Sequence, residues 1–519
     1  MMMNMKKTLI LFSFFALTLL ASCDLDLYPV TDYNEGNVFV PKDTTTSQYT
    51  TAAQMENLVK GFYSGVLKND RMQRLQFMDW LVYSEVRADN AYNGSPSTAE
   101  LVGIESNKID GSNQNVDRDW DDFQLAINAA NQVICNIDRI QKLDPSMTQA
   151  QHDSWLAQAD IIKAFYVFRG TQLFNTIPVI NSIPDPITAE NVEEVYPSYY
   201  PSRPARENIY AQIVEMLEFA AQKAPDLSAE DKFVLSKTFA KGILAHVYAE
   251  KSNIQDWSKV ALWCEAVEKD MNVNSGSAET LRASLCDSYK DLWSYDVSAK
   301  TAAKNTKESI FEVTFTSSSG NWLHMMFHRN QFSPGDNYTW SKWITPSRNL
   351  IAAYDAEGDT ERKNVSVLWD ACGWSLYYPE SEYAFMGKME TNATSIILMR
   401  LAEIYLLHAE ALAMTGDSSG ALKYVNAVRQ RAKLPSVSGL SGDQLIDKIL
   451  DERRLELAFE GFRFFDLARH DRVIDVHNNV WKNDSYYLSR DPLDQYSIFL
   501  PVPTTVLDTN PNIEQNQGY

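Results

Sequence analysis

Three carboxylates lie close together near the C-terminal end of the sequence, at Glu456, Glu460 and Asp466. A glycoside hydrolase needs two such groups at a fixed separation across a sugar, so this block could hold a catalytic pair. The acids alternate with arginines at helical spacing, however, and that pattern is typical of structural ion pairs. We therefore predict a structural role for residues 452–469 and no catalytic residue, with a hydrolase as the competing hypothesis.

Two histidines four residues apart, His324 and His328, have the spacing that places two imidazoles on one face of a helix, as a metal site requires. No third ligand is identifiable at a suitable spacing, and the surrounding sequence lacks a helical pattern. The acidic run at 355–359 lacks the spacing of an EF-hand loop and is typical of a turn. We predict no metal site and no cofactor, and the sequence leaves calcium binding open.

Two segments with loop composition mix aromatic rings with amide, carboxylate and guanidinium groups, at 89–94 and 321–343. Sugars present C–H faces that stack on rings and hydroxyls that pair with polar side chains, so a shallow sugar site needs both kinds of group. The competing interpretation is that each tryptophan belongs to the core, because tryptophan is mostly buried in folded proteins. We predict the following ligand-binding residues: Asp89, Tyr92, Asn93, Trp322, Arg329, Tyr338, Trp340 and Trp343.

The elements that must position these loops are mostly helices. Thr148 and Gln151 have capping-box spacing and open a helix with apolar residues at helical intervals. Further amphipathic stretches are predicted at about 51–68, 120–142, 206–223, 235–251, 257–269, 396–415 and 421–432. Between 271 and 395 long helical runs are few, the segment 310–315 has a strand-like composition, and polar turns are frequent.

Helix, tight turn and helix at this spacing indicate tetratricopeptide-type pairing. We predict a mainly α fold in which a tetratricopeptide-like helical-pair scaffold covers about 49–270 and 396–519. An irregular, loop-rich ligand-binding portion with a few short strands is inserted at about 271–395. Residues 49–519 are expected to form a single domain.

The N-terminus has the pattern of a lipid-attachment signal. Lys6 and Lys7 precede an apolar run at 9–20, and Ala21 and Ser22 supply the small residues before Cys23. We predict a lipoprotein signal peptide at 1–22, lipid attachment at Cys23 and a tether at 23–48. An ordinary secreted protein with a chance cysteine at this position is the alternative.

Charge and cysteine usage exclude several classes of function. The 519-residue chain carries 68 acidic against 47 basic residues, a net charge of -21, which argues against nucleic acid and against electrostatic docking on anionic lipid. Cys135, Cys264, Cys286 and Cys372 are scattered without a C-x-x-C pair, so zinc or redox chemistry is not indicated. A disulfide between Cys264 and Cys286 stays open.

Several motifs together carry a family resemblance. Residues 401–411 read LAEIYLLHAEA, and residues 452–469 read ERRLELAFEGFRFFDLAR. The segments at 164–180 and 499–503 have matching patterns, so the agreement extends over nearly the whole mature chain. On these motifs the sequence resembles the SusD/RagB-type outer-membrane lipoproteins.

The resemblance implies a cell-surface protein, lipid-anchored in the outer membrane, that captures oligosaccharide or polysaccharide. It further implies delivery of that ligand to a SusC-like TonB-dependent transporter, without catalysis. Helices would form the scaffold and irregular loops the ligand surface. A glycoside hydrolase, a pure protein–protein scaffold, and peptide or glycoprotein ligands remain as alternatives.

Overall fold

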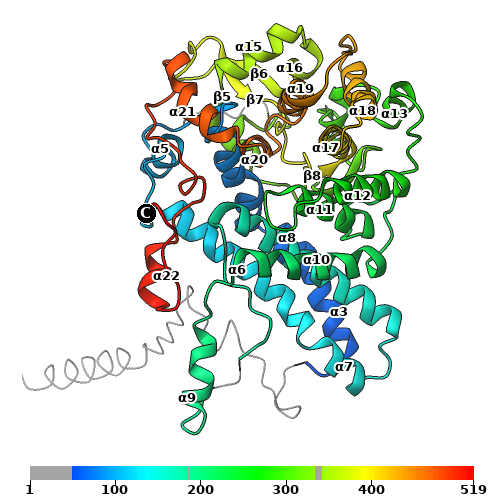
Figure 1. The fold of residues 1–519 in the computed structure, drawn as a ribbon, viewed down its shortest axis with the longest axis vertical. Coiled ribbons are helices and arrows are strands. Elements are labelled where there is room, and N and C mark those ends of the chain that lie inside the picture. The colour runs from blue at the N-terminus through cyan, green and yellow to red at the C-terminus, as the bar shows by residue number, and fades with distance from the viewer. Residues whose placement is uncertain (1–48, 185–186, 334–341) are drawn as a thin grey trace, which may run out of the picture.

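A computed structural model of the chain describes residues 49–184, 187–333 and 342–519. The predicted signal peptide and tether, Cys23, Tyr338 and Trp340 lie outside the described residues. Figure 1 shows a mainly helical molecule in which strands are short and few. The predicted mainly α fold is confirmed, and the predicted single domain stays a prediction.

The scaffold is a series of helices in which each packs against the next. The members are α6 (Gln114–Ile134), α8 (Gln149–Phe174), α10 (Arg206–Lys223), α11 (Lys237–Ala249), α12 (Trp257–Asp270), α17 (Leu401–Met414), α18 (Ser418–Arg431) and α19 (Gly442–Glu456). In Figure 1 they stack from α6 and α10 in the lower half to α17 and α18 in the upper half. Thr148 caps α8 with the predicted capping box to Gln151.

Shorter helices surround this series. They are α3 (Ala52–Gly61), α4 (Asp70–Gln73), α5 (Ala99–Ser106), α7 (Ile137–Leu143), α9 (Val192–Val195), α13 (Ala278–Ser284), α14 (His324–Phe327), α15 (Arg348–Glu357), α16 (Thr360–Ser366), α20 (Arg463–Arg469), α21 (Val473–Asn483) and α22 (Thr504–Thr509). Three π-helical segments, η1 (Phe62–Leu67), η2 (Arg74–Asp79) and η3 (Val82–Val86), lead to the first predicted loop, and η4 (Tyr196–Tyr199) and η5 (Tyr289–Leu292) are 3₁₀ turns.

The strands form four antiparallel pairs: β1 (Ala91–Asn93) with β5 (Ile344–Pro346), β2 (Tyr295–Asp296) with β3 (Thr301–Ala302), β4 (Ser309–Val313) with β8 (Ile396–Arg400), and β6 (Val367–Asp370) with β7 (Tyr383–Met386). The strand expected at 310–315 is therefore β4. The helix expected from 396 begins only at Leu401, because Ile396 and Ile397 pair with β4, and β-branched residues favour that environment.

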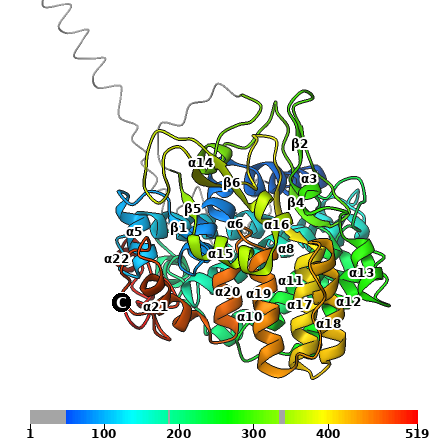
Figure 2. The same ribbon diagram turned by 90° about the horizontal axis from the view of Figure 1, so that it is seen from above.

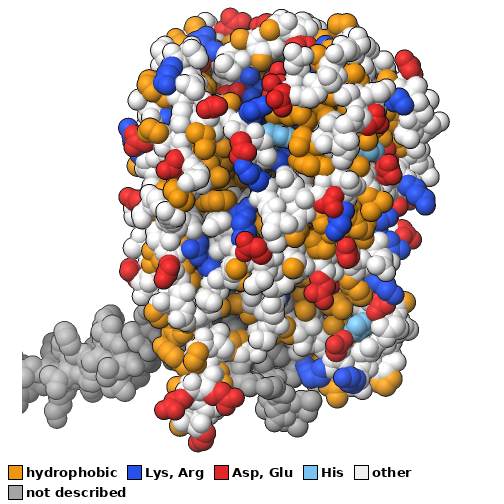
Figure 3. Space-filling model, viewed as in Figure 1, with side chains coloured by type: hydrophobic (Ala, Val, Ile, Leu, Met, Phe, Trp, Pro, Cys, Tyr) orange, Lys and Arg blue, Asp and Glu red, His pale blue; other side chains and the backbone are white. Residues whose placement is uncertain are grey.

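The loop-rich portion holds more helix than expected, since α13, α15 and α16 all lie within 271–395. Figure 2 places α14, β6 and β2 along one edge of the molecule and α17, α18 and α19 along the opposite edge. Acidic and basic side chains are interspersed on the face that Figure 3 shows. The protruding segment around α9 shows acidic side chains on its surface in Figure 3, and Glu193 and Glu194 of this helix are exposed.

The C-terminal block of acids and arginines is buried. Glu456 pairs with Arg400 at 2.7 Å, with Arg362 at 3.2 Å and with Arg431. These arginines come from distant parts of the chain, so the expected pairing along one helix is replaced by pairing between elements. Asp466 does pair along its own helix, with Arg469 three residues on in α20, and it also binds Arg453 from α19; burial raises the pKa of Asp466, but these cations outweigh it and the pKa is lowered.

Candidate functional site

The two predicted ligand loops lie side by side. Strands β1 and β5 pair so that Tyr92 faces Thr345 and Asn93 faces Ile344, and Figure 2 shows the two strands adjacent. The backbone N–H of Gly94 donates to the carbonyl of Trp343 at 3.0 Å. Segments separated by about 250 positions in the sequence thus form one structural unit, and the structure brings the predicted clusters together.

The predicted residues of the first loop are internal. The carboxylate of Asp89 accepts hydrogen bonds from Arg463, and the hydroxyl of Tyr92 donates to Asp484 at 2.5 Å. The amide of Asn93 donates to Glu105 at 2.8 Å. All three side chains are buried and already bonded to other residues of the chain, so they lie beneath the molecular surface.

Three predicted residues of the second loop are described, and these lie nearer the surface. Trp322 and Trp343 are half-buried and pack against the main hydrophobic core. The guanidinium of Arg329 binds the carboxylate of Asp370 at 2.5 Å, and that carboxylate also lies 3.3 Å from Nε2 of His328. Burial lowers the pKa of His328 to about 4 despite Asp370, so this imidazole is neutral at neutral pH.

Among the described residues, the exposed rings near this region are Trp369 and Tyr486, which the sequence analysis does not single out. We define the aromatic strip as Trp369, Tyr378, Arg348 and Tyr486. The rings of Trp369 and Tyr378 meet edge to face at 5.3 Å. The guanidinium of Arg348 lies 4.4 Å from the Tyr378 ring centre and 4.3 Å from that of Tyr486, so the four side chains form one chain of contacts.

The strip has exposed rings at its ends and a buried ring in its middle. Trp369 is 39% exposed and Tyr486 is 43% exposed, whereas Tyr378 is buried between them. Burial raises the pKa of Tyr378, so its hydroxyl stays protonated and donates to the carbonyl of Pro346 at 2.9 Å. Tyr92 lies behind the strip, stacked on Tyr377 at 4.5 Å and 6.4 Å from the ring of Tyr486.

This arrangement supplies the groups that a shallow sugar site needs. The rings of Trp369 and Tyr486 offer flat apolar faces for sugar C–H groups. Arg348 supplies a hydrogen-bond donor for sugar hydroxyls. Asp370, which follows Trp369 in the sequence, supplies an acceptor. The one signal in the sequence was the same mixture of aromatic and acidic residues in the short segments 367–370 and 483–487.

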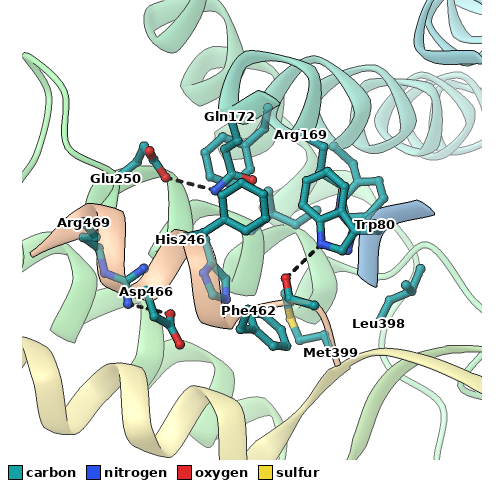
Figure 4. Close-up of a pocket in the computed structure, with 15 residues that line it drawn as sticks. Trp80, Arg169, Gln172, His246, Glu250, Leu398, Met399, Phe462, Asp466 and Arg469 are labelled. Atoms are coloured by element: carbon teal, nitrogen blue, oxygen red, sulfur yellow. Dashed lines mark hydrogen bonds and ion pairs between the residues drawn. The ribbon is translucent and has the colours of Figure 1, made fainter. Parts of the chain in front are cut away.

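A separate pocket lies within the helical scaffold, between α8, α11 and α20 (Figure 4). Its volume is about 50 Å³, against about 150 Å³ for a cavity that accepts benzene. A sugar ring is too large for this pocket, which therefore does not compete with the loop surface as a glycan site.

The described residues include four scattered cysteines and the histidine pair at 324 and 328. Cys135, Cys264, Cys286 and Cys372 are free thiols there, and no group of three or more His, Cys, Asp or Glu side chains in that part of the chain is placed to hold a metal ion. His324 contacts the carbonyl of Asn321, and His328 contacts Asp370. No helix among the described residues is long and apolar enough to cross a membrane.

Comparison with known proteins agrees with this architecture. The SusD-like protein P2 of Formosa agariphila is 26% identical over 99% of this chain and all of its own. A SusD homologue from Bacteroides thetaiotaomicron superposes with a TM-score of 0.70 at 18% identity, covering 91% of this chain and 97% of its own. A laminarin-binding SusD-like protein gives a TM-score of 0.68 at 22% identity, covering 91% of this chain and all of its own. The model of the SusD family matches residues 243–519, just over half of the sequence, and this chain therefore belongs to the SusD family.

Proposed function

We propose that this chain is a lipid-anchored protein of the cell surface that captures oligosaccharide or polysaccharide and passes it to a SusC-like TonB-dependent outer-membrane transporter. The observation that carries the glycan assignment is the aromatic strip. It combines two exposed rings with an arginine and a neighbouring carboxylate on the loop-rich edge. The laminarin-binding neighbour supports the choice of a glucan as the first probe.

The ligand surface in this proposal extends from the aromatic strip toward the second predicted loop. Trp322, Arg329 and Trp343 belong to it because Arg329 binds Asp370, the residue that follows Trp369. Tyr338 and Trp340 belong to the same loop and are proposed on the sequence alone. Lipid attachment at Cys23 would hold the protein beside its transporter at a high effective concentration.

The test uses the mature chain, residues 23–519, with Cys23→Ser to prevent acylation. A panel of polysaccharides that includes laminarin is screened by calorimetry, and Trp369→Ala and Tyr486→Ala are compared with the parent. Each variant should bind the selected glycan about 2- to 10-fold more weakly, which is the value of one aromatic contact. Tyr196→Ala is the matched control, because Tyr196 is an exposed ring near the protruding α9.

Unchanged affinity in both strip variants would refute the proposed site, and the absence of any glycan ligand would refute the proposed function. Release of reducing sugar during prolonged incubation would favour the hydrolase hypothesis instead. Cys23→Ala in the full chain should move the protein from the membrane fraction to the soluble fraction, and the wild-type chain should co-purify with an outer-membrane transporter.

A further inference from the structure

The scaffold pocket contains one charged group that has no opposite charge beside it among the described residues. Its other charged lining residues are paired: Glu250 with Gln172 and Arg206, His246 with Glu403, Asp466 with Arg453, and Arg469 with Glu410. Arg169, which also lines the pocket, has no carboxylate partner in that part of the chain. A buried charge without a partner is costly, so the imbalance calls for an explanation.

Arg169 is 8% exposed and is held in place by two rings. Its guanidinium carbon lies 4.3 Å from the ring of Trp80 and 4.4 Å from the ring of Phe165. One nitrogen donates to the carbonyl of Gln76 at 3.2 Å. A guanidinium has five N–H donors, so most of its capacity is unused within the described residues. Burial lowers its pKa only to about 10, and the group is therefore cationic at neutral pH.

Charged and apolar side chains lie on different parts of the pocket wall. Figure 4 shows Arg169 and Trp80 on one side and Glu250, Asp466 and Arg469 on the other. Apolar side chains line the space with them, among them Ile243, Leu398, Met399 and Phe462. An anion entering the pocket would meet a cation at one side and carbon surface beside it.

We propose that this pocket binds a small monocarboxylate with a short apolar body, of the size of acetate or propionate. The carboxylate would pair with the planar fork of Arg169, which matches its geometry. The short carbon chain would lie against Phe462 and Met399. A volume of about 50 Å³ admits a group of this size and excludes a sugar. A phosphate is disfavoured because it has no carbon chain to lie against Phe462 and Met399.

This site is separate from the aromatic strip, so its test does not depend on the proposed function. Propionate, propionamide and inorganic phosphate are added in turn to the mature chain, and binding is followed by saturation-transfer NMR. Propionate should bind in the millimolar range, and the uncharged propionamide, which has the same shape, should bind at least ~10-fold more weakly because it lacks the charge that pairs with Arg169. Phosphate should fail to displace propionate.

The matched variants are Arg169→Lys and Arg203→Lys. Arg169→Lys keeps the charge but loses the fork, and should weaken propionate at least ~10-fold. Arg203 binds Asn516 and backbone carbonyls away from the pocket, and its replacement should leave propionate binding unchanged. The proposal is overturned if propionate does not bind, if propionamide binds equally well, or if Arg169→Lys folds and binds as the parent does. If Arg169→Lys does not fold, the comparison of propionate with propionamide on the parent chain still tests the proposal.

Discussion

The guanidinium of Arg463 binds the carboxylate of Asp89 through two hydrogen bonds, of 2.8 and 3.0 Å, between residues 374 positions apart. Arg454 approaches the same carboxylate to 3.2 Å, and the hydroxyl of Ser347 donates to the backbone carbonyl of Asp89 at 2.8 Å. The C-terminal block therefore holds the first predicted loop in place beside β5. Asp89, which the sequence analysis predicts to bind ligand, is engaged here with two arginines of the C-terminal block.

Asp89→Ala should destabilise the protein by about 3–5 kcal/mol, because it leaves the buried Arg463 and the partly buried Arg454 without their shared anion. The pKa of Asp89 is lowered to about 2, since the nearby arginines outweigh its burial, and the carboxylate is therefore charged across the neutral range. Urea unfolding at neutral pH measures the change in the free energy of unfolding.

Asp508→Ala is the control for this substitution, because Asp508 is exposed in α22. It should change stability by less than about 0.5 kcal/mol. If Asp89→Ala also lost less than about 0.5 kcal/mol, Arg454 and Arg463 would have found other partners. The position of the first predicted loop would then not depend on this carboxylate.

The bounds of a helix could be predicted where the helix's own residues determine them. The predicted ranges 206–223 and 257–269 coincide with α10 and α12 to within one residue, and the capping box at Thr148 is present. The error at 396–400 has a tertiary cause, since apolar residues that fit a helix face also fit a strand, and only the pairing with β4 decides between them.

The candidate site was only partly predictable, because side-chain burial depends on contacts between distant segments. Tyr92 and Asn93 have loop composition, but the pairing of β1 with β5 places them inside. Trp369 resembles any core tryptophan in sequence, and its exposure follows from its position near the end of the two-stranded β6–β7 ribbon. Tyr486 contacts Arg348 of α15 and Tyr92 of β1, and no local pattern reveals these distant partners.

Gly94→Ala should separate the two predicted loops. A Cβ at this position would lie 2.2 Å from the carbonyl oxygen of Lys342, a backbone atom that cannot rotate away. The pairing of β1 with β5 would have to shift, at a cost of about 1–3 kcal/mol. Glycan affinity should fall as well, because Trp343 moves with that backbone. Thermal unfolding and calorimetry measure the two effects.

The matched substitution is Gly65→Ala. Gly65 lies in the π-helical segment η1, and a Cβ added there would meet nothing within 4 Å, so the methyl group would occupy open space. This variant should retain both stability and glycan binding. If Gly94→Ala also retained both, the junction between the loops would be more adaptable than its close backbone contact indicates.

Tyr92→Phe should loosen the support behind the aromatic strip. The Tyr92 hydroxyl donates to Asp484 at 2.5 Å and accepts the backbone N–H of Arg348 at 3.0 Å. Removing it leaves that N–H and one carboxylate oxygen with fewer partners, which should cost about 1–3 kcal/mol. Glycan binding should weaken in parallel, because Arg348 and the segment that carries Tyr486 are both anchored there. An unchanged affinity would show that the strip is positioned without Tyr92.

His477 should make stability depend on pH in the acid range. Burial, followed by the neighbouring cation of Arg490, lowers the pKa of His477 to about 3, and its Nδ1 lies 2.9 Å from the carbonyl of Arg87. In the unfolded chain a histidine has a pKa of about 6.5, so between these values the unfolded state binds a proton that the folded state does not. The free energy of unfolding should therefore decrease as the pH falls from about 6.5 toward 3, by up to about 1.4 kcal/mol per pH unit from this residue.

His477→Gln removes the titration while its amide can still donate to the Arg87 carbonyl, so the slope should become shallower by that amount. Urea unfolding of both proteins across this range measures the two slopes, and equal slopes would show that His477 is protonated to the same extent in the folded and unfolded states.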